Sequence, residues 1–188
     1  MEEWVERALK RWPNVPALYG WLKLDRRGRW LIKGETISRP QIIDVINRNY
    51  AADERGCWYF QNGPQRGYMQ LERAPLLIHI ESDRLIAHTQ LTVSEISAVF
   101  LDEDGGMYLQ TEQGPSALLD SDLDWALARM EVGGRPVDET QVAAALALPS
   151  GAKSEITIRL LGNAIPIYKL NRSDAPVRLK FVLDPKPQ

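Results

Sequence analysis

The sequence feature that most limits the fold is a turn of the form Asp-x-x-Gly, which occurs three times. The copies lie at residues 25–28, 53–56 and 102–105, and two residues after each glycine an apolar pair begins: Trp30-Leu31, Trp58-Tyr59 and Met107-Tyr108. Asp can hydrogen-bond the backbone of its own turn, and Gly accepts a positive φ angle. The pattern is therefore typical of tight connections between antiparallel strands.

The first and third turns share a longer context, which predicts an internal duplication. Each closes a hairpin, continues through a loop that contains Gly34 or Gly114, and reaches a helical stripe that begins near Ser38 or near residues 120–122. A strand–turn–strand–loop–helix unit would then occur in both halves of the chain. The alternative is that Asp-x-x-Gly is common turn chemistry and that the match has no further meaning.

Helical patterns are few and short. Apolar residues at helical spacing, with charged residues between them, predict an amphipathic helix over residues 2–12. Ser38 is expected to cap a second helix that carries Pro40 in its first turn. Asp138 and Gln141 have the spacing of a capping box ahead of a short Ala/Leu helix.

The C-terminal part alternates apolar and polar residues with period two between residues 156 and 183. This pattern predicts a three-stranded antiparallel meander whose last strand runs from Val177 to Leu183. The predicted fold class is α+β with two small lobes, each a curved antiparallel sheet with a packed helix. The predicted domains are residues 1–82 and 83–188.

The charge balance excludes several functional classes. Lys and Arg total 23 against 25 Asp and Glu, a net charge of −2, so the chain lacks the basic excess that binding extended nucleic acid requires. With 44% apolar residues, the chain is far from the composition of a disordered protein.

The chain carries no predicted membrane or signal segment. No run approaches the roughly 20 apolar residues of a membrane helix, and early charges such as Glu2 and Glu6 interrupt any signal-peptide core. We expect a cytoplasmic globular protein without a membrane partner.

Neither a metal nor a cofactor is predicted, and no catalytic residue is assigned. His79 and Glu81 would share the solvent face of a strand, and His88 alone does not complete a metal site, which needs three or four converging ligands. Cys57 has no neighbouring base and is expected to be structural. The sequence also lacks a nucleophile elbow and a Gly-rich phosphate loop.

Aromatic residues and arginines crowd the first half of the chain. The aromatic residues are Trp21, Trp30, Trp58, Tyr59, Phe60 and Tyr68, and the arginines are Arg26, Arg27, Arg29, Arg39, Arg48, Arg55, Arg66 and Arg73. Rings beside guanidinium groups can bind bases and phosphates. The competing interpretation is that the rings form a core and the arginines are ordinary surface charges.

Four blocks of this region resemble the pattern of DUF1285, a proteobacterial family of unknown function. They are Gly28-x-Trp30, the run 34–39 (GETISR), Asp53-Glu54-x-Gly56, and Arg66-Gly67-x-Met69-x-Leu71-Glu72-x-Ala74-Pro75. The resemblance covers about residues 20–76 and departs at the C-terminus, so the chain is identified as a diverged sister group. It implies two lobes, a duplicated core and a second lobe similar to a pleckstrin-homology domain.

The resemblance also implies candidate ligand-binding residues. Arg39 and Arg66 match polar positions of the family pattern, and Trp30 and Tyr59 match aromatic ones. As a site, the arginines would anchor an anion and the rings would stack on the ligand. As structure, Trp30 and Tyr59 would be buried in the core, which is the interpretation we favour for these two residues.

The resulting functional hypothesis is a non-catalytic protein that binds a small anionic, nucleotide-like ligand or a protein partner between its lobes. The resemblance implies that the protein is bacterial and associated with signalling. One alternative is a hydrolase acting on a nucleotide through Asp102 and Asp104, although solvated Asp is normal in such a turn. Another is an interaction module that adds a strand at an exposed sheet edge.

Overall fold

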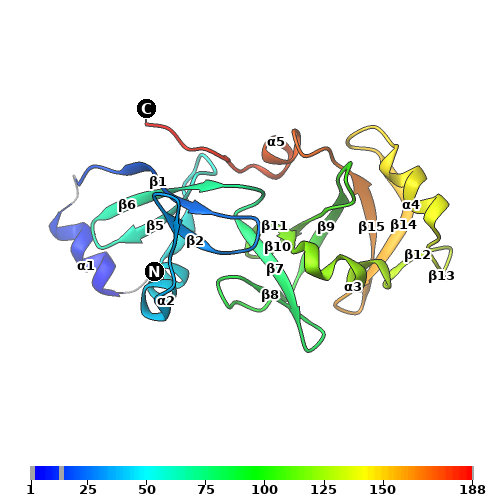
Figure 1. Ribbon diagram of the computed structural model, residues 1–188, viewed down its shortest axis with the longest axis horizontal. Coiled ribbons are helices and arrows are strands. Elements are labelled where there is room, and N and C mark those ends of the chain that lie inside the picture. Colours follow the sequence, from blue (N-terminus) through cyan, green and yellow to red (C-terminus); the bar gives the residue numbers. More distant parts are fainter. Residues whose placement is uncertain (1–2, 13–14, 188) are drawn as a thin grey trace. The chain divides into compact units, whose positions relative to one another are not determined.

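The computed structural model describes residues 3–12 and 15–187 (Figure 1). They divide into two compact units that are not simply the two halves of the chain. Unit 1 contains the described residues of Met1–Pro75, with His88–Gln90 and Lys180–Gln188, and unit 2 contains Leu76–Ala87 and Leu91–Leu179. The predicted boundary between residues 82 and 83 lies in the turn of a hairpin that belongs to unit 2.

Unit 1 is a six-stranded sheet with two helices. Its elements are α1 (Glu3–Arg11), β1 (Leu18–Leu24), β2 (Trp30–Ile32), β3 (Glu35–Thr36), α2 (Pro40–Arg48), β4 (Tyr50–Ala52), β5 (Trp58–Asn62) and β6 (Gln65–Leu71). The strand order is β3-β2-β1-β6-β5-β4. All neighbours are antiparallel except β1 and β6, which are parallel at the centre.

Unit 2 is a nine-stranded sheet with short helices. Its elements are β7 (Leu76–Glu81), β8 (Arg84–Ala87), β9 (Ile96–Leu101), β10 (Met107–Thr111), β11 (Gly114–Leu118), a 3₁₀ turn η1 (Asp120–Asp122), α3 (Leu123–Leu127), β12 (Met130–Val132), β13 (Arg135–Pro136), α4 (Glu139–Leu146), β14 (Lys153–Leu160), β15 (Asn163–Lys169) and α5 (Ala175–Leu179). The order is β13-β12-β14-β15-β9-β10-β11-β7-β8, with β15–β9 and β11–β7 parallel.

The two sheets share one topology, which confirms the predicted duplication. Six strands of unit 2, in the order β11-β10-β9-β15-β14-β12, repeat the order β3-β2-β1-β6-β5-β4 with the same parallel pair at the centre. The helix between the third and fourth strands is α2 in one copy and α3 in the other. Unit 2 adds β13 and α4 before β14, and adds the β7–β8 hairpin beyond β11.

Equivalent hydrogen bonds fix the alignment of the copies at single residues. The N–H of Glu72 donates to the carbonyl of Leu24 in unit 1, and that of Leu170 donates to Leu101 in unit 2, each just beyond the central parallel pair. Leu24 is thus equivalent to Leu101, and the turn that follows begins at Asp25 in one copy and at Asp102 in the other.

The sheet of unit 1 is strongly curved. Three strands separate β2 from β4 in the sheet, so a flat sheet would hold them about 19 Å apart. Nevertheless, the rings of Trp30 on β2 and Tyr50 on β4 lie 4.9 Å apart, centroid to centroid. Trp30 is buried there, and its Nε1 donates to Oδ1 of Asn47 on α2 at 2.8 Å. The inner face of the curve therefore holds one core with α2.

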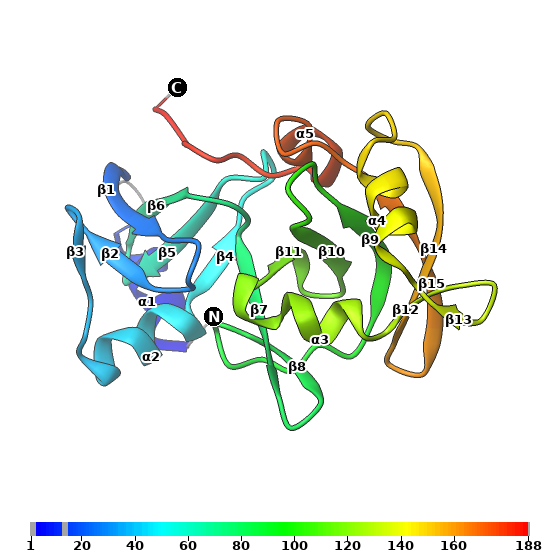
Figure 2. The ribbon, with the colours of Figure 1, turned by 45° about the vertical axis from the view of Figure 1, so that its right-hand side comes forward.

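Unit 2 has a larger aliphatic core that its helices help to close. Its buried members come from the two central strands and from strands on either side of them, as far as β8 and β12: Ile78, Leu85, Val99, Leu101, Met107, Leu109, Leu118, Met130, Ile156, Ile158, Leu160 and Ile167. From α4, Ala145 is buried in this cluster, and Figure 2 shows the helix alongside β14. The predicted capping box of α4 is confirmed by reciprocal hydrogen bonds between Asp138 and Gln141.

Two local predictions were wrong. Residues 177–183 do not form the third strand of a meander, because α5 occupies Ala175–Leu179; Pro176 fits the first turn of a helix but cannot donate to a sheet ladder. Instead β12 completes an antiparallel trio with β14 and β15. At α2 the N-cap is Arg39 rather than Ser38, with no side-chain cap bond. No helix among the described residues is long and apolar enough to span a membrane.

Candidate functional site

The β5–β6 hairpin puts a group of polar and aromatic side chains on one face of the unit 1 sheet. Its register pairs Tyr59 with Tyr68 and Gln61 with Arg66. Because side chains alternate between faces along a strand, these four share a face, and Trp58 lies on the other. Tyr59 and Tyr68 are buried and their rings meet edge to face at 5.7 Å.

Arg66 is held in place by two neighbours on this face, Tyr59 and Gln61. Its guanidinium carbon lies 4.5 Å from the centroid of the Tyr59 ring, a cation–π arrangement. Its Nε donates to Oε1 of Gln61 at 3.1 Å. Gln61 is itself fully buried and fixed, because its Nε2 donates to the carbonyl of Gly63 at 2.9 Å. The Arg66 side chain is thus oriented before any ligand arrives.

Arg55 on the same side of unit 1 has a different environment. Its Nη2 and Nε lie 2.9 and 3.1 Å from Oδ2 of Asp53, and its guanidinium stands 5.7 Å from the Tyr68 ring. The hydroxyl of Tyr68 donates to the same carboxylate oxygen at 3.0 Å, and Tyr19 stacks on Tyr68 at 4.7 Å. The hydrogen bond with Asp53 raises the pKa of Arg55, with Tyr19 and Tyr68 contributing.

The two arginines therefore differ in charge compensation. Arg55 forms an ion pair with Asp53, whereas across residues 3–12 and 15–187 no carboxylate lies within 4.0 Å of the Arg66 guanidinium. Arg66 is only partly exposed. A guanidinium that has lost part of its hydration without gaining a counter-ion is attracted to an incoming anion.

Protonation states on this face leave little for acid–base or nucleophilic chemistry. Burial raises the pKa of the Cys57 thiol, and the nearby Asp53 charge raises it further. Burial also raises the pKa of Tyr68. Burial alone would raise the pKa of Asp53, but hydrogen bonds from Cys57 N–H and from Arg55 outweigh it and hold the pKa below its ordinary value. At neutral pH the site offers a protonated thiol, a neutral phenol and an ionised carboxylate.

The structure brings together only part of the predicted set. Arg66 and Tyr59 are in contact, and because Arg66 covers the Tyr59 ring, that ring supports the guanidinium rather than presenting a face to a ligand. Trp30 is buried in the inner core, where it packs against Tyr50 and, at 4.7 Å, against His88. Arg39 caps α2 and is exposed, and no contact joins its side chain to Arg66 among the described residues.

The carboxylates considered for a hydrolase are engaged in their own turn. Asp102 is fully buried; its Oδ1 accepts N–H bonds from Gly106 at 2.7 Å and Asp104 at 3.0 Å, and its Oδ2 accepts Nε of Arg172 at 3.1 Å. Asp104 pairs with the same arginine at 2.9 Å. These contacts are those of a structural turn rather than of an open acid–base pair.

Sequence reasoning did not assign Arg55, Gln61 or Tyr68 to the site. A signal was available: a hairpin closing at the turn 62–65 pairs residue 61 with 66 and residue 59 with 68. Counting outward from that turn would have put Gln61 and Tyr68 beside the two residues that were assigned.

Comparison with known proteins agrees with this fold and assigns no activity. The crystal structure of a DUF1285 family protein from Silicibacter pomeroyi DSS-3 matches 82% of this chain and 84% of its own, with 12% identity and a TM-score of 0.53. The crystal structure of another DUF1285 family protein, from Shewanella baltica OS155, matches 54% of this chain and 86% of its own, with 15% identity and a TM-score of 0.44. A search of curated proteins found no match.

The first of these likenesses confirms, at the level of fold, the resemblance to DUF1285 drawn from the motifs. The family itself is a different one. A family model named DUF2944 and described as "Protein of unknown function (DUF2946)" matches residues 1–186. The chain therefore belongs to this family of unknown function, a group distinct from DUF1285 that shares its fold.

Proposed function

We propose that this protein is a non-catalytic binding protein that takes a small anionic ligand at Arg66. The observation that carries the proposal is the guanidinium of Arg66, fixed by Tyr59 and Gln61 yet without a carboxylate partner in the described part of the chain. Binding an anion there would supply the missing counter-charge without the cost of ordering a flexible side chain.

The proposed ligand class is a phosphate or carboxylate compound, nucleotide-like in the form that the sequence favoured. A planar guanidinium presents two parallel N–H donors to such a group, and its outer face can stack on a base. Arg55 is less suited to this task, because Asp53 already occupies it. The binding groove between the lobes that the sequence suggested stays a prediction.

A non-catalytic role is supported by the protonation states around Arg66. Neither the raised pKa of the Cys57 thiol nor the lowered pKa of Asp53 provides a nucleophile and base poised near neutral pH. Association with signalling rests on the resemblance alone, and a protein partner in place of the small ligand stays a prediction.

The test is a thermal-shift and calorimetric screen of the full chain against inorganic phosphate, adenosine and guanosine nucleotides, and dicarboxylates. We expect a phosphate compound to raise the unfolding temperature, since a ligand that binds only the folded state stabilises it. Arg66→Ala should weaken that ligand about tenfold or more, the loss of a charge-assisted pair.

Two variants complete the design. Arg27→Ala removes another exposed arginine of unit 1 and should leave the affinity unchanged, and Arg39→Ala tests whether the second predicted anchor contributes. If Arg66→Ala and Arg27→Ala bound the ligand equally well, the anion would lie elsewhere and the proposal would fail.

A further inference from the structure

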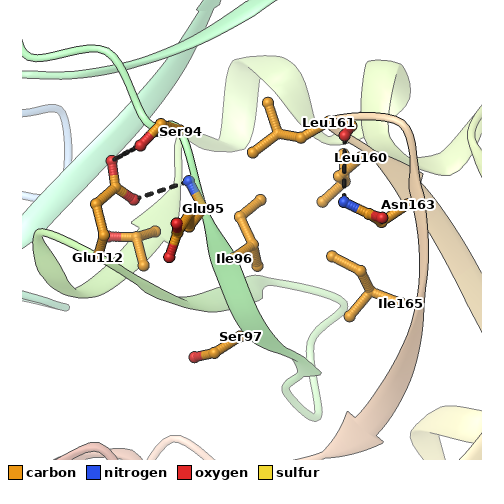
Figure 3. Close-up of a pocket in the computed structure, with 10 residues that line it drawn as sticks. Ser94, Glu95, Ile96, Ser97, Glu112, Leu160, Leu161, Asn163 and Ile165 are labelled. Atoms are coloured by element: carbon orange, nitrogen blue, oxygen red, sulfur yellow. Dashed lines mark hydrogen bonds between the residues drawn. The ribbon is translucent and has the colours of Figure 1, made fainter.

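The sheet of unit 2 opens between its two central strands. β9 and β15 pair in parallel only from Val99 with Ile167 to Leu101 with Lys169. Before that point the strands separate, and a cavity of about 370 Å³ lies between the start of β9 and the β14–β15 hairpin (Figure 3). Inside such an opening, backbone N–H and C=O groups lack the neighbouring strand that would normally be their hydrogen-bond partner.

The duplicated copy shows that the topology does not require this opening. In unit 1 the equivalent strands, β1 and β6, pair at Leu18 and Gly67 as well, with a register shift between Leu18 and Leu22. A Cβ placed on Gly67 would lie 2.5 Å from Cδ1 of Leu22, so the glycine leaves room for that side chain. By the alignment of the copies, unit 2 has Ile165 at this position, followed by Pro166.

Pro166 and Ala164 explain why the backbone stays open. The β14–β15 hairpin closes at the pair Leu160 and Asn163, which is joined by two residues with positive φ. In such a hairpin the backbone groups of the closing pair bond to each other. Those of the next pair, Arg159 and Ala164, point away from the partner strand. The N–H of Arg159 does donate away from β15, to Arg129. Ala164 and Pro166 thus face β9, but Pro166 has no N–H to give. Ala164 is not itself among the residues that line the cavity, but the register directs its N–H and C=O toward β9.

The lining gives the opening a definite chemistry. Ile96, Leu160 and Ile165 form apolar walls, and Glu95 and Glu112 stand near the mouth (Figure 3). The Glu112 carboxylate accepts hydrogen bonds from the N–H of Ser94 at 2.8 Å, from the hydroxyl of Ser94 at 3.0 Å and from the N–H of Glu95 at 3.1 Å. The ten lining residues carry two carboxylates and no basic side chain.

We infer that this opening binds an extended peptide segment of a partner protein, with a Lys or Arg side chain at Glu95 and Glu112 and an apolar side chain between Ile96 and Ile165. The peptide backbone pairs with the N–H and C=O of Ala164. Strand addition supplies main-chain affinity, and the alternation of basic and apolar side chains supplies specificity. The site belongs to unit 2 and does not depend on the anion proposed at Arg66.

A peptide suits the opening better than a small cation does. A small amine would pair with the carboxylates but leave the outward backbone of Ala164 unmet. An extended segment meets both, because its own N–H and C=O groups repeat along the strand while its side chains alternate between the apolar walls and the acidic mouth.

The experiment titrates the full chain, labelled for NMR, with three capped octapeptides: alternating Val and Lys, alternating Val and Glu, and alternating Val and Thr. We expect the Val-Lys peptide to bind about tenfold more tightly than the other two and to weaken as salt is added. It should shift the amide of Ala164 and the methyl groups of Ile96 and Ile165.

Three variants localise the effect. Glu95→Lys reverses an exposed charge at the mouth and should weaken binding of the Val-Lys peptide about fivefold or more. Ala164→Pro removes the outward N–H without breaking the hairpin ladder and should weaken binding of that peptide similarly. Glu155→Lys makes the same charge change at an exposed position of β14 outside the lining and should bind as the unchanged protein does.

Several results would overturn the inference. One is equal affinity for the Val-Lys, Val-Glu and Val-Thr peptides; another is a Glu95→Lys protein that binds no differently from Glu155→Lys. Shifts confined to residues outside the opening, or no saturable binding below about 1 mM, would count against it equally. So would a free lysine amide that competes as strongly as the peptide, because the site would then recognise a small cation.

Discussion

At the scale of single residues, three aspartates perform one task at three turns. The Oδ1 atom of Asp25, Asp53 and Asp102 accepts N–H groups from the residues two and four positions later, at 2.7 to 3.0 Å. The remaining oxygen meets an arginine in each case, Arg29, Arg55 or Arg172. This local chemistry explains why the turns could be recognised from the sequence alone.

The Asp102 turn provides the first prediction. We expect Asp102→Ala to lower the free energy of unfolding by about 2–4 kcal/mol, because two backbone N–H groups lose their acceptor in a buried place and Arg172 loses a partner. Asp104→Ala, whose carboxylate is 62% exposed, should cost less than about 1 kcal/mol. Urea unfolding of both variants measures the difference; equal losses would mean that the buried turn contributes nothing special.

The second prediction concerns acid stability through Asp53. Its pKa is lower in the folded chain than in the unfolded chain, so its contribution is present above an unfolded value near ~4 and is lost as pH falls through the folded pKa. Asp53→Asn should therefore destabilise the protein at pH 7 and flatten the loss of stability below about pH 5. Denaturation curves at several pH values test this; an unchanged acid slope would contradict it.

At the scale of elements, hairpins were predictable and the contacts between distant strands were not. β1–β2 and β9–β10 follow from turn residues a few positions apart, whereas the parallel pairs β1–β6 and β9–β15 join segments separated by dozens of residues. The C-terminal error has the same origin: the period-two pattern of residues 177–183 fits a strand, and only the missing strand neighbour and Pro176 decide for α5.

The third prediction concerns the capping box of α4. Asp138→Ala removes the acceptor for the N–H of Gln141, a bond of 2.8 Å, and should cost about 1 kcal/mol. Thr140→Ala, an exposed change in the same turn, should cost about half as much or less. Hydrogen exchange should show the loss in the amides of α4 before those of β14. Equal protection in both variants would show that packing, not the cap, holds the helix.

At the scale of the whole molecule, the parts of the candidate site that could be predicted from the sequence are those that depend on local register. Arg66 and Tyr59 fall on one face because hairpin register is local, and their contact was within reach. Trp30 lies on the opposite, inner face of the sheet, and its contact there with Tyr50 depends on a curvature that needs the complete set of strands. The same holds for the opening at Ile165, which is recognisable only by comparison with Gly67 in the other copy.

Unit 1 includes a segment near the C-terminus, residues 180–187, as well as the strands β1 to β6. Phe181 is buried, the N–H of Val182 donates to the carbonyl of Gly56, and the N–H of Leu71 donates to the carbonyl of Leu183. These bonds join the tail to the Asp53 turn and to β6. A Cβ on Gly56 would collide with the carbonyl of Lys180, so the tail passes as close as a glycine allows.

Ending the chain after residue 179 should therefore destabilise unit 1, although β1 to β6 would be intact in sequence. We expect faster amide exchange at Tyr59 and Tyr68, by about tenfold or more, because a buried aromatic ring and two backbone bonds are lost. Amides of Ile158 and Ile165 in unit 2 are the internal control and should change far less. Uniform acceleration in both units would mean that the segment stabilises the molecule as one cooperative body, and unchanged exchange at Tyr59 would mean that the tail adds nothing to unit 1.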